Sequence, residues 1–302
     1  MSHLINVLLP HCPICGRQDN VVFGFRKDNN DIYSCTECRV EFLDPQPSDE
    51  TLASIYNSGY FFGNGDAEAS QQVALSKRAT ARLYLQIIAG LVKGTRPRLL
   101  EIGCGTGDFL VEARSRGFEV AGIEYSREAA EVANANLQAD AVRSGSIDSV
   151  KLSTNAYDVI AMFDVIEHLR NPAFSLKCLN AALKPGGTAV VVTPCLDAWS
   201  RRLLGRFWME YKTEHLTYFS RKSLALLFES SGFDMIRFVP NYKILSLDYI
   251  ARHFERFPVP FVSPLVRGIR TLVPSRLAHM KIKIVASGTM AIARKISEAS
   301  TC

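Results

Sequence analysis

The stretch LLEIGCGTGDFL combines one acid, Glu101, with three glycines at alternate positions, Gly103, Gly105 and Gly107. It follows a strand-like run and leads into a helical pattern, so the glycines let a ligand lie against the backbone at the carboxyl end of a first strand. A dinucleotide fingerprint needs a third glycine three residues after the second. Asp108 stands there instead, and an acid is a poor neighbour for a pyrophosphate at a helix N-terminus. The loop therefore favours a ligand with a cationic group and no phosphate.

A second acid lies seventeen residues beyond Gly107. Glu124 ends the run FEVAGIE, where a carboxylate can accept hydrogen bonds from two ribose hydroxyls. A ribose without a pyrophosphate, together with a positively charged group, describes S-adenosylmethionine.

Four of the eight cysteines form two Cys-x-x-Cys pairs with nineteen residues between them, a spacing typical of a tetrahedral zinc ribbon. These cysteines are Cys12, Cys15, Cys35 and Cys38. Gly16 can supply the positive φ that a tight knuckle needs. We expect a structural Zn²⁺, because a closed four-thiolate site has no open position for catalysis; a thiol redox pair is the alternative.

The elements that position these residues follow from the hydrophobic period. After Pro97, strand-like runs (RLLEIG, FEVAGIE, ADAVRSG, YDVIAMFD, GTAVVVTP) alternate with helical ones, which predicts an α/β fold with a mostly parallel sheet covered by helices. We expect a zinc ribbon over 1–47 with hairpin strands in VVFGF and DIYSC, and a linker with N-terminal helices over 48–97. The larger domain spans 98–302, with a basic insertion at about 242–286.

These motifs, in this order, resemble the class I S-adenosylmethionine-dependent methyltransferases, in the branch that includes the ubiquinone-biosynthesis methyltransferases. The resemblance covers about 70–240 and includes GSID, YDVIAMFDVIEHLRNP and LKPGGTAVVVTP. It implies a Rossmann-like seven-stranded sheet with helices on both faces, beside the small zinc ribbon. The ribbon, FLDPQP and EHLTYFS narrow the resemblance to a bacterial subgroup whose members often modify sugars, glycans or secondary metabolites.

The resemblance also implies a cofactor site. The acid and the glycine loop would line the methionine end of S-adenosylmethionine, the second acid would hold the ribose, and GSID would flank the adenine. The end of the fourth strand would border the transferred methyl group. The implied residues are Glu101, Gly103, Cys104, Gly105, Gly107, Glu124, Ser146, Ile147, Asp148, Phe163 and Asp164. Ser146 stands where an Asp is more typical of the family.

Two histidines are candidate catalytic residues. Methyl transfer is an in-line displacement that depends on positioning, and a hydroxyl acceptor also needs its proton removed by a base or with the help of a metal. His168 follows the fourth strand in EHL, and His215 lies in TEHLTYFS after the aromatic and basic stretch WSRRLLGRFWMEYK. Helix capping or loop fixing is the alternative role for each. We expect Glu167 to be structural, since a carboxylate is a weak base unless it is buried.

Composition and charge limit the class of protein. Of the 302 residues, 47% are hydrophobic and 22% are charged, which indicates a globular chain. The first residues lack a basic start and a cleavage site, and no run is long enough to span a membrane, so we expect a cytoplasmic protein, or one peripheral at the inner membrane face. Residues 190–302 hold 17 Lys and Arg against 8 Asp and Glu, whereas residues 1–189 hold 18 against 22.

The basic C-terminal third favours an anionic acceptor or a membrane face, and a solvated basic lid is the plain alternative. We predict O-methylation of a sugar, glycan or other polar small molecule. RNA methylation, with the ribbon aiding RNA binding, is the rival. However, base-methylating enzymes usually carry an Asn/Asp-Pro-Pro-aromatic stretch where this chain has FDVIEHL, so nucleic acid is disfavoured. A non-catalytic cofactor-binding module is the second alternative, which the intact cofactor motifs disfavour.

Overall fold

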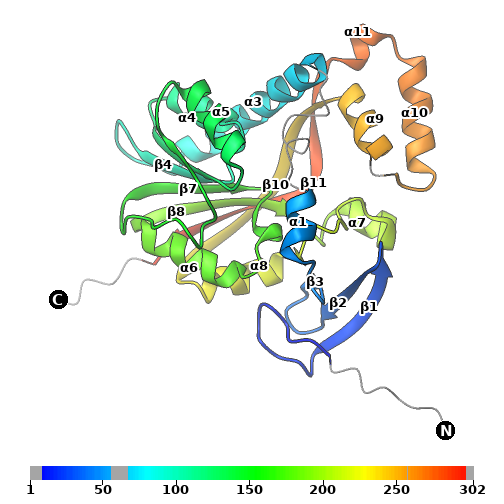
Figure 1. The fold of residues 1–302 in the computed structure, drawn as a ribbon, viewed down its shortest axis with the longest axis horizontal. Helices are drawn as coiled ribbons and strands as arrows, with labels where there is room; N and C mark the ends of the chain where they lie inside the picture. Colours follow the sequence, from blue (N-terminus) through cyan, green and yellow to red (C-terminus); the bar gives the residue numbers. More distant parts are fainter. Residues whose placement is uncertain (1–8, 56–66, 257, 297–302) are drawn as a thin grey trace.

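A computed structural model of the chain describes residues 9–55, 67–256 and 258–296. Its largest element is a seven-stranded sheet with the order β10-β11-β8-β7-β4-β5-β6 (Figure 1). The strands β4 to β8 run parallel, and β11 is antiparallel to both of its neighbours. The strands are β4 (Arg98–Ile102), β5 (Glu119–Glu124), β6 (Val142–Ser144), β7 (Tyr157–Phe163), β8 (Leu183–Pro194), β10 (Phe233–Ser246) and β11 (Lys281–Lys295). The predicted Rossmann-like α/β fold is confirmed.

Helices cover both faces of this sheet because successive strand residues point to opposite sides. On one face, Ile160 and Met162 of β7 pack in a cluster with apolar residues of α6 (Pro172–Ala182) and α8 (Arg221–Glu229). On the other face, Val159 and Ala161 pack with residues from three further helices. These helices are α3 (Ala67–Ala89), α4 (Asp108–Arg114) and α5 (Arg127–Leu137). This packing holds the strands of the sheet in place. Because β4 to β8 are parallel, their carboxyl ends lie at the same edge of the sheet.

The N-terminal module is a second sheet with the order β1-β2-β3-β9. Its hairpin strands are β1 (Val21–Lys27) and β2 (Asn30–Cys35), at the places predicted from the sequence, followed by β3 (Glu41–Leu43) and the short helix α1 (Asp49–Ile55). The fourth strand, β9 (Thr217–Tyr218), comes from the larger domain and pairs with Glu41 and Phe42 of β3. Backbone pairing thus crosses the division that we expected at residue 47.

A helical insertion lies between the last two strands of the large sheet. It contains α9 (Leu247–Arg256), α10 (Val262–Leu272) and α11 (Ser275–Ala278). The insertion is shorter than the expected range of about 242–286, because β10 and β11 continue past β8 as a two-stranded arm that pairs Ser246 with Lys281. In the described part of the chain, no helix has the length and apolar character needed to cross a membrane.

Candidate functional site

The glycine loop between β4 and α4 has a left-handed backbone at each of its three glycines. Their φ angles are 70° at Gly103, 52° at Gly105 and 80° at Gly107. A Cβ at Gly103 would lie 2.4 Å from Cγ2 of Val165, so only glycine fits there. A Cβ at Gly105 would meet no atom within 4 Å. The loop therefore presents bare backbone to open space at Gly105.

The carboxylate of Glu124 joins the ends of two neighbouring strands. Its Oε2 accepts a hydrogen bond from the backbone N–H of Gly105 at 2.7 Å, and its Oε1 accepts one from the N–H of Ser126 at 2.9 Å. The backbone carbonyl of the same residue accepts from the N–H of Gly145 at 2.8 Å, which brings the loop after β6 to this edge. Glu124 is 3% exposed. The second acid of the motif is thus fixed beside the glycine loop.

Glu101 is buried, and its Oε2 has no hydrogen-bond partner among the described residues. Burial, with added repulsion from Glu124 and Asp108, raises the pKa of Glu101 well above its usual range. Buried polar atoms normally have a hydrogen-bond partner, and a cationic ligand would provide a partner for this oxygen. This arrangement suits S-adenosylmethionine. Glu101 could face its ammonium group and Glu124 its ribose, beside the open backbone of Gly105.

The remaining loop residues differ in exposure. Ser146 donates its backbone N–H to Oγ of Ser149 at 3.0 Å, so the expected adenine loop is a closed turn. Ile147 is buried in the core and Asp148 is exposed. Cys104 is also buried, and burial raises its thiol pKa. Its side chain belongs to the core, and its carbonyl accepts the N–H of Gly107 within the loop.

The end of β7 holds Phe163 and Asp164. The ring of Phe163 packs on Tyr84 at 4.9 Å and on Phe109 at 4.8 Å between centroids. Asp164 has a φ of 53°, which is uncommon for a non-glycine residue, and its Oδ2 pairs with Nζ of Lys243 at 2.6 Å. Although burial lowers the pKa of Lys243, the Asp164 carboxylate raises it above its usual range, so the lysine stays charged. Sequence reasoning missed Lys243, because no local motif links it to Asp164.

His168 and His215 lie side by side. His168 ends the 3₁₀ turn η1 (Ile166–His168), and His215 precedes β9. Nδ1 of His168 lies 2.9 Å from the carbonyl oxygen of Glu214, and Nδ1 of His215 lies 2.8 Å from that of Glu210. A carbonyl only accepts, so each Nδ1 carries a hydrogen and the other ring nitrogen, Nε2, has the lone pair in the neutral form. The backbone of segment 210–214 therefore sets both tautomers.

The protonation of this cluster departs from ordinary values. Burial lowers the pKa of His168 to about 4, and burial together with His168 lowers that of His215 well below its usual range. Burial, followed by repulsion from Asp164, raises the pKa of Glu167 to about 8. Glu167 accepts a hydrogen bond from Oγ1 of Thr193 at 2.9 Å and is 1% exposed. At neutral pH both imidazoles are therefore neutral.

The same three side chains can also hold a metal. Ligand atoms of Glu167, His168 and His215 all lie within 4.8 Å of one another. One carboxylate and two imidazoles suit a divalent transition metal. The arrangement can thus assist deprotonation of a hydroxyl in two ways, by a histidine base or by a bound cation.

The four cysteines of the ribbon converge on one point, with their sulfur atoms within 4.8 Å of one another. The Sγ atoms of Cys12 and Cys38 are 3.4 Å apart, and those of Cys15 and Cys35 are 3.7 Å apart. Four thiolates at about 2.3 Å from one tetrahedral zinc would be separated by roughly 3.8 Å. In the first knuckle Gly16 has a φ of 72°, as expected. The cluster is compatible with the predicted zinc.

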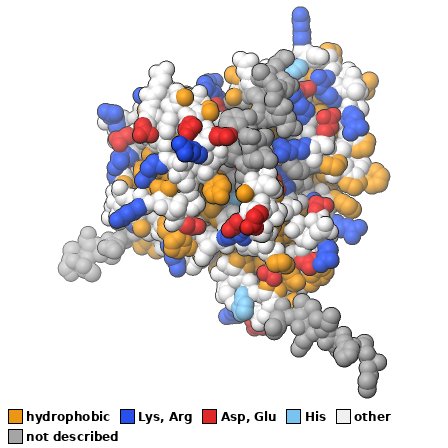
Figure 2. All heavy atoms as spheres, in the orientation of Figure 1, with side chains coloured by type: hydrophobic (Ala, Val, Ile, Leu, Met, Phe, Trp, Pro, Cys, Tyr) orange, Lys and Arg blue, Asp and Glu red, His pale blue; other side chains and the backbone are white. Residues whose placement is uncertain are grey.

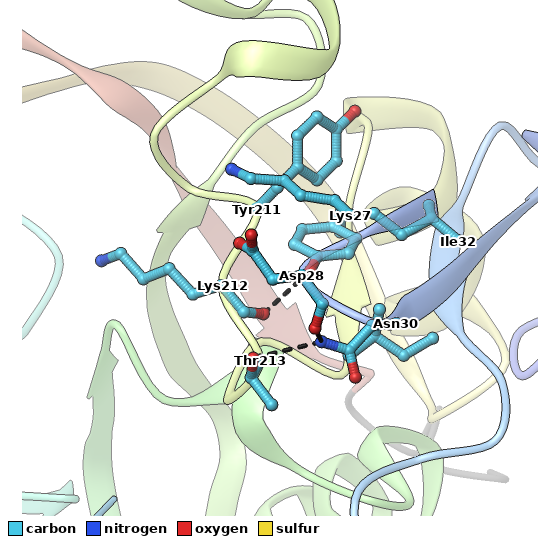
Figure 3. A pocket seen from close by; sticks show the side chains of 9 residues that line it. Lys27, Asp28, Asn30, Ile32, Tyr211, Lys212 and Thr213 are labelled. Carbon is cyan, nitrogen blue, oxygen red and sulfur yellow. Dashed lines mark hydrogen bonds between the residues drawn. The ribbon is translucent and has the colours of Figure 1, made fainter. Parts of the chain in front are cut away.

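The ribbon hairpin also meets the segment that holds the histidines. Nδ2 of Asn30 donates to Oγ1 of Thr213 and to the carbonyl of Asp28, both at 3.1 Å (Figure 3). A cavity of about 670 Å³ opens beside this contact, between β1, residues 206–214 and the chain after α9. Its lining includes two acidic side chains and five basic ones, Arg26, Lys27, Arg206, Lys212 and Arg256. The ribbon thus forms one wall of a basic cavity.

Comparisons with known proteins identify the family of this chain. A family model described as a methyltransferase domain matches residues 75–237, more than half of the chain. The chain belongs to this methyltransferase family, and it is a class I S-adenosylmethionine-dependent methyltransferase, as the sequence motifs predicted.

Curated relatives match part of the chain. An O-methyltransferase, resE, of Aspergillus sclerotiorum is 24% identical over 63% of this chain and 72% of its own length. A ubiquinone biosynthesis O-methyltransferase of Nitrobacter winogradskyi is 30% identical over 57% of this chain and 58% of its own length. The mitochondrial one of Schizosaccharomyces pombe is 33% identical over 39% and 44%. The chain thus spans about half the length of these two ubiquinone-biosynthesis relatives.

Two solved structures share the fold. An S-adenosylmethionine-dependent methyltransferase of Thermotoga maritima, a possible histamine N-methyltransferase, aligns with a TM-score of 0.50 and 20% identity over 76% of this chain and 95% of its own. A methyltransferase-like protein of Bacillus halodurans aligns with a TM-score of 0.51 and 14% identity over 72% and 99%. At these identities the likeness concerns the fold alone.

Proposed function

We propose that this chain methylates a hydroxyl group of a polar, anionic small molecule and that His215 is the general base. The observation that carries the proposal is the pairing of the His215 Nδ1 with the Glu210 carbonyl, which leaves Nε2 with a lone pair in a buried site. The names of the curated relatives, which are O-methyltransferases, support a hydroxyl acceptor.

The residues at this edge of the sheet have different roles in the proposed reaction. S-adenosylmethionine, when bound, supplies an electrophilic methyl group. Glu101 would face its cationic ammonium group and Glu124 its ribose hydroxyls, while His215 accepts the proton that leaves the attacking hydroxyl. His168 packs edge to face on His215 and keeps its ring in place. These residues orient the acceptor and hold its proton, which is what an in-line displacement needs.

The anionic character of the acceptor is inferred from the basic cavity. Tyr211, Lys212 and Thr213 line this cavity, and the residues on either side of them supply the carbonyls that hold the two histidines. We infer that the cavity takes a phosphate or carboxylate of the acceptor, since five basic side chains line it against two acidic ones. A nucleotide sugar or another acidic glycan precursor has the required hydroxyl and charge.

An acceptor screen with radioactive methyl-labelled S-adenosylmethionine tests this function. We expect label in an O-methyl product of a hydroxylated anion, such as a nucleotide sugar, and none in RNA. Arg206→Ala should raise the acceptor KM several-fold, whereas Arg202→Ala, on the helix α7 (Trp199–Leu204) outside the cavity lining, should leave it unchanged. Label in RNA alone would contradict the proposal and favour the rival function.

The cysteine cluster is proposed as a structural zinc site. It has four sulfur ligands, which leaves no open coordination position, and it lies in the ribbon sheet rather than at the edge of the large sheet. Its role would be to fold the hairpin that forms one wall of the basic cavity.

A further inference from the structure

Helix α10 presents an apolar face to the outside of the molecule. Phe261, directly before the helix, is 91% exposed, Leu265 is 63%, Ile269 is 43% and Leu272 is 84% exposed. Their spacing of four, four and three residues places them on one side of a helix. A surface helix usually turns its polar side to solvent. On α10 the outward side is apolar instead.

Polar contacts fix the opposite side of α10 to the protein. Nε of Arg270 pairs with Oδ1 of Asp248 in α9 at 2.9 Å. Oγ of Ser263 donates to the carbonyl of Phe254 at 3.0 Å and accepts the N–H of Val259 at 2.8 Å. These contacts settle which side of α10 faces α9, so the apolar side is held outward.

The apolar face continues into the chain that follows. Leu277 in α11 is 54% exposed, Met280 just before β11 is 57% exposed, and Ile282 at the start of β11 is 49% exposed. Figure 1 draws α10 and α11 at one margin of the molecule, and Figure 2 shows hydrophobic and basic side chains together along that margin. The exposed apolar residues therefore come from consecutive elements at one margin of the molecule.

The charged residues of the segment that forms this edge have one sign. The sequence has no acidic residue between Glu255 and Glu298, whereas residues 256–285 contain six Lys and Arg. Arg276, Lys281 and Lys283, which follow the helix along the chain, are exposed. An outward apolar helix face followed along the chain by exposed basic residues complements an anionic bilayer, in which acyl chains lie beneath negative headgroups.

We propose that α10, with α11 and the start of β11, docks on an anionic lipid bilayer. The apolar side chains of the outward face enter the interface, and the flanking Arg and Lys contact the headgroups. The surface is formed by Phe261, Leu265, Ile269, Leu272, Arg276, Leu277, Met280, Lys281, Ile282 and Lys283. This proposal rests on the insertion alone and stands whichever acceptor the active site uses.

Co-sedimentation of the full chain with vesicles tests the proposal. We expect binding to vesicles of phosphatidylcholine with phosphatidylglycerol, little binding to phosphatidylcholine alone, and weaker binding as salt rises. Leu265→Ser combined with Leu272→Ser should lower the partition coefficient by roughly tenfold or more, since two exposed leucines no longer enter the interface. Arg276→Gln combined with Lys281→Gln should lower it by about fivefold per charge and flatten the salt dependence.

Leu203→Ser is the matched control, because Leu203 is 73% exposed but lies in α7, outside the surface. It should bind vesicles like the unmodified chain, and all variants should keep the same affinity for S-adenosylmethionine. Equal vesicle binding by the leucine pair and the control would overturn the proposal, and so would no binding to anionic vesicles at low salt. Light scattering that shows a dimer, lost in the leucine variant, would assign this surface to a second copy of the chain instead.

Discussion

The imidazole rings of His168 and His215 meet edge to face, with centroids 4.7 Å apart and an angle of 86° between their planes. Both rings are held through Nδ1 by carbonyls of one short segment, 210–214. One histidine belongs to the turn after β7 and the other to the turn before β9, so two distant parts of the chain form one buried pair. This pair is the centre of the proposed chemistry.

His215→Ala should lower kcat about 10²–10⁴-fold while the affinity for S-adenosylmethionine is retained, if His215 removes the acceptor's proton. Burial and His168 keep the pKa of His215 well below its usual range. The base is therefore neutral at neutral pH and is lost only as the pH falls through that lowered pKa. We expect a pH–rate profile whose acidic limb lies below the ordinary histidine pKa of about 6.5 and which disappears in the variant.

His168→Ala is the comparison for that experiment. If His168 is essential for activity and His215 is dispensable, the base is His168, in the turn after β7. Loss of activity on treatment with a chelator, restored by a divalent cation while the ribbon zinc stays bound, would instead favour a cation held by Glu167, His168 and His215.

Glu124→Ala should weaken the binding of S-adenosylmethionine by roughly 2–3 kcal/mol, because a pair of charge-assisted hydrogen bonds to the ribose is lost. Isothermal titration calorimetry measures this change. Glu119→Ala is the matched control, since Glu119 begins the same strand and pairs at the surface with Arg98. Equal affinities of the two variants would remove Glu124 from the cofactor site.

Cys35→Ser should release the zinc and lower the free energy of unfolding of the ribbon, because metal binding there contributes folding energy. Metal analysis of the purified protein should find one zinc per chain, and Cys178→Ser, outside the cluster, should keep it. The affinity for S-adenosylmethionine should change little. Freshly purified protein without zinc would contradict the site.

The sequence was informative where a local structure depends on neighbours along the chain. The glycine loop, the acid at the end of β5 and the two cysteine knuckles each lie within one turn, so residue types and spacing predict them. The salt bridge between Asp164 and Lys243 is different, because it joins β7 to β10 and depends on how far β10 extends. That length was underestimated, since the outer halves of β10 and β11 pair with each other beyond β8 and carry no motif.

Two other features also needed the structure. The strand β9 has only two residues, Thr217 and Tyr218, and a segment that short has no periodicity. Its pairing with β3 joins the ribbon to the larger domain, which no local pattern indicates. The apolar side of α10 is visible as a helical pattern, but only the contacts with α9 show that this side faces outward.

Titration of the protein with S-adenosylmethionine in a calorimeter tests the central claim most directly. We predict saturable binding at one site per chain. Gly105→Val should abolish this binding without unfolding the protein, because a side chain there would fill the space open to the ligand. Gly94→Val, at another open glycine with a positive φ, should leave the binding intact and controls for backbone strain. Binding of a nicotinamide cofactor with no response to S-adenosylmethionine would contradict the account.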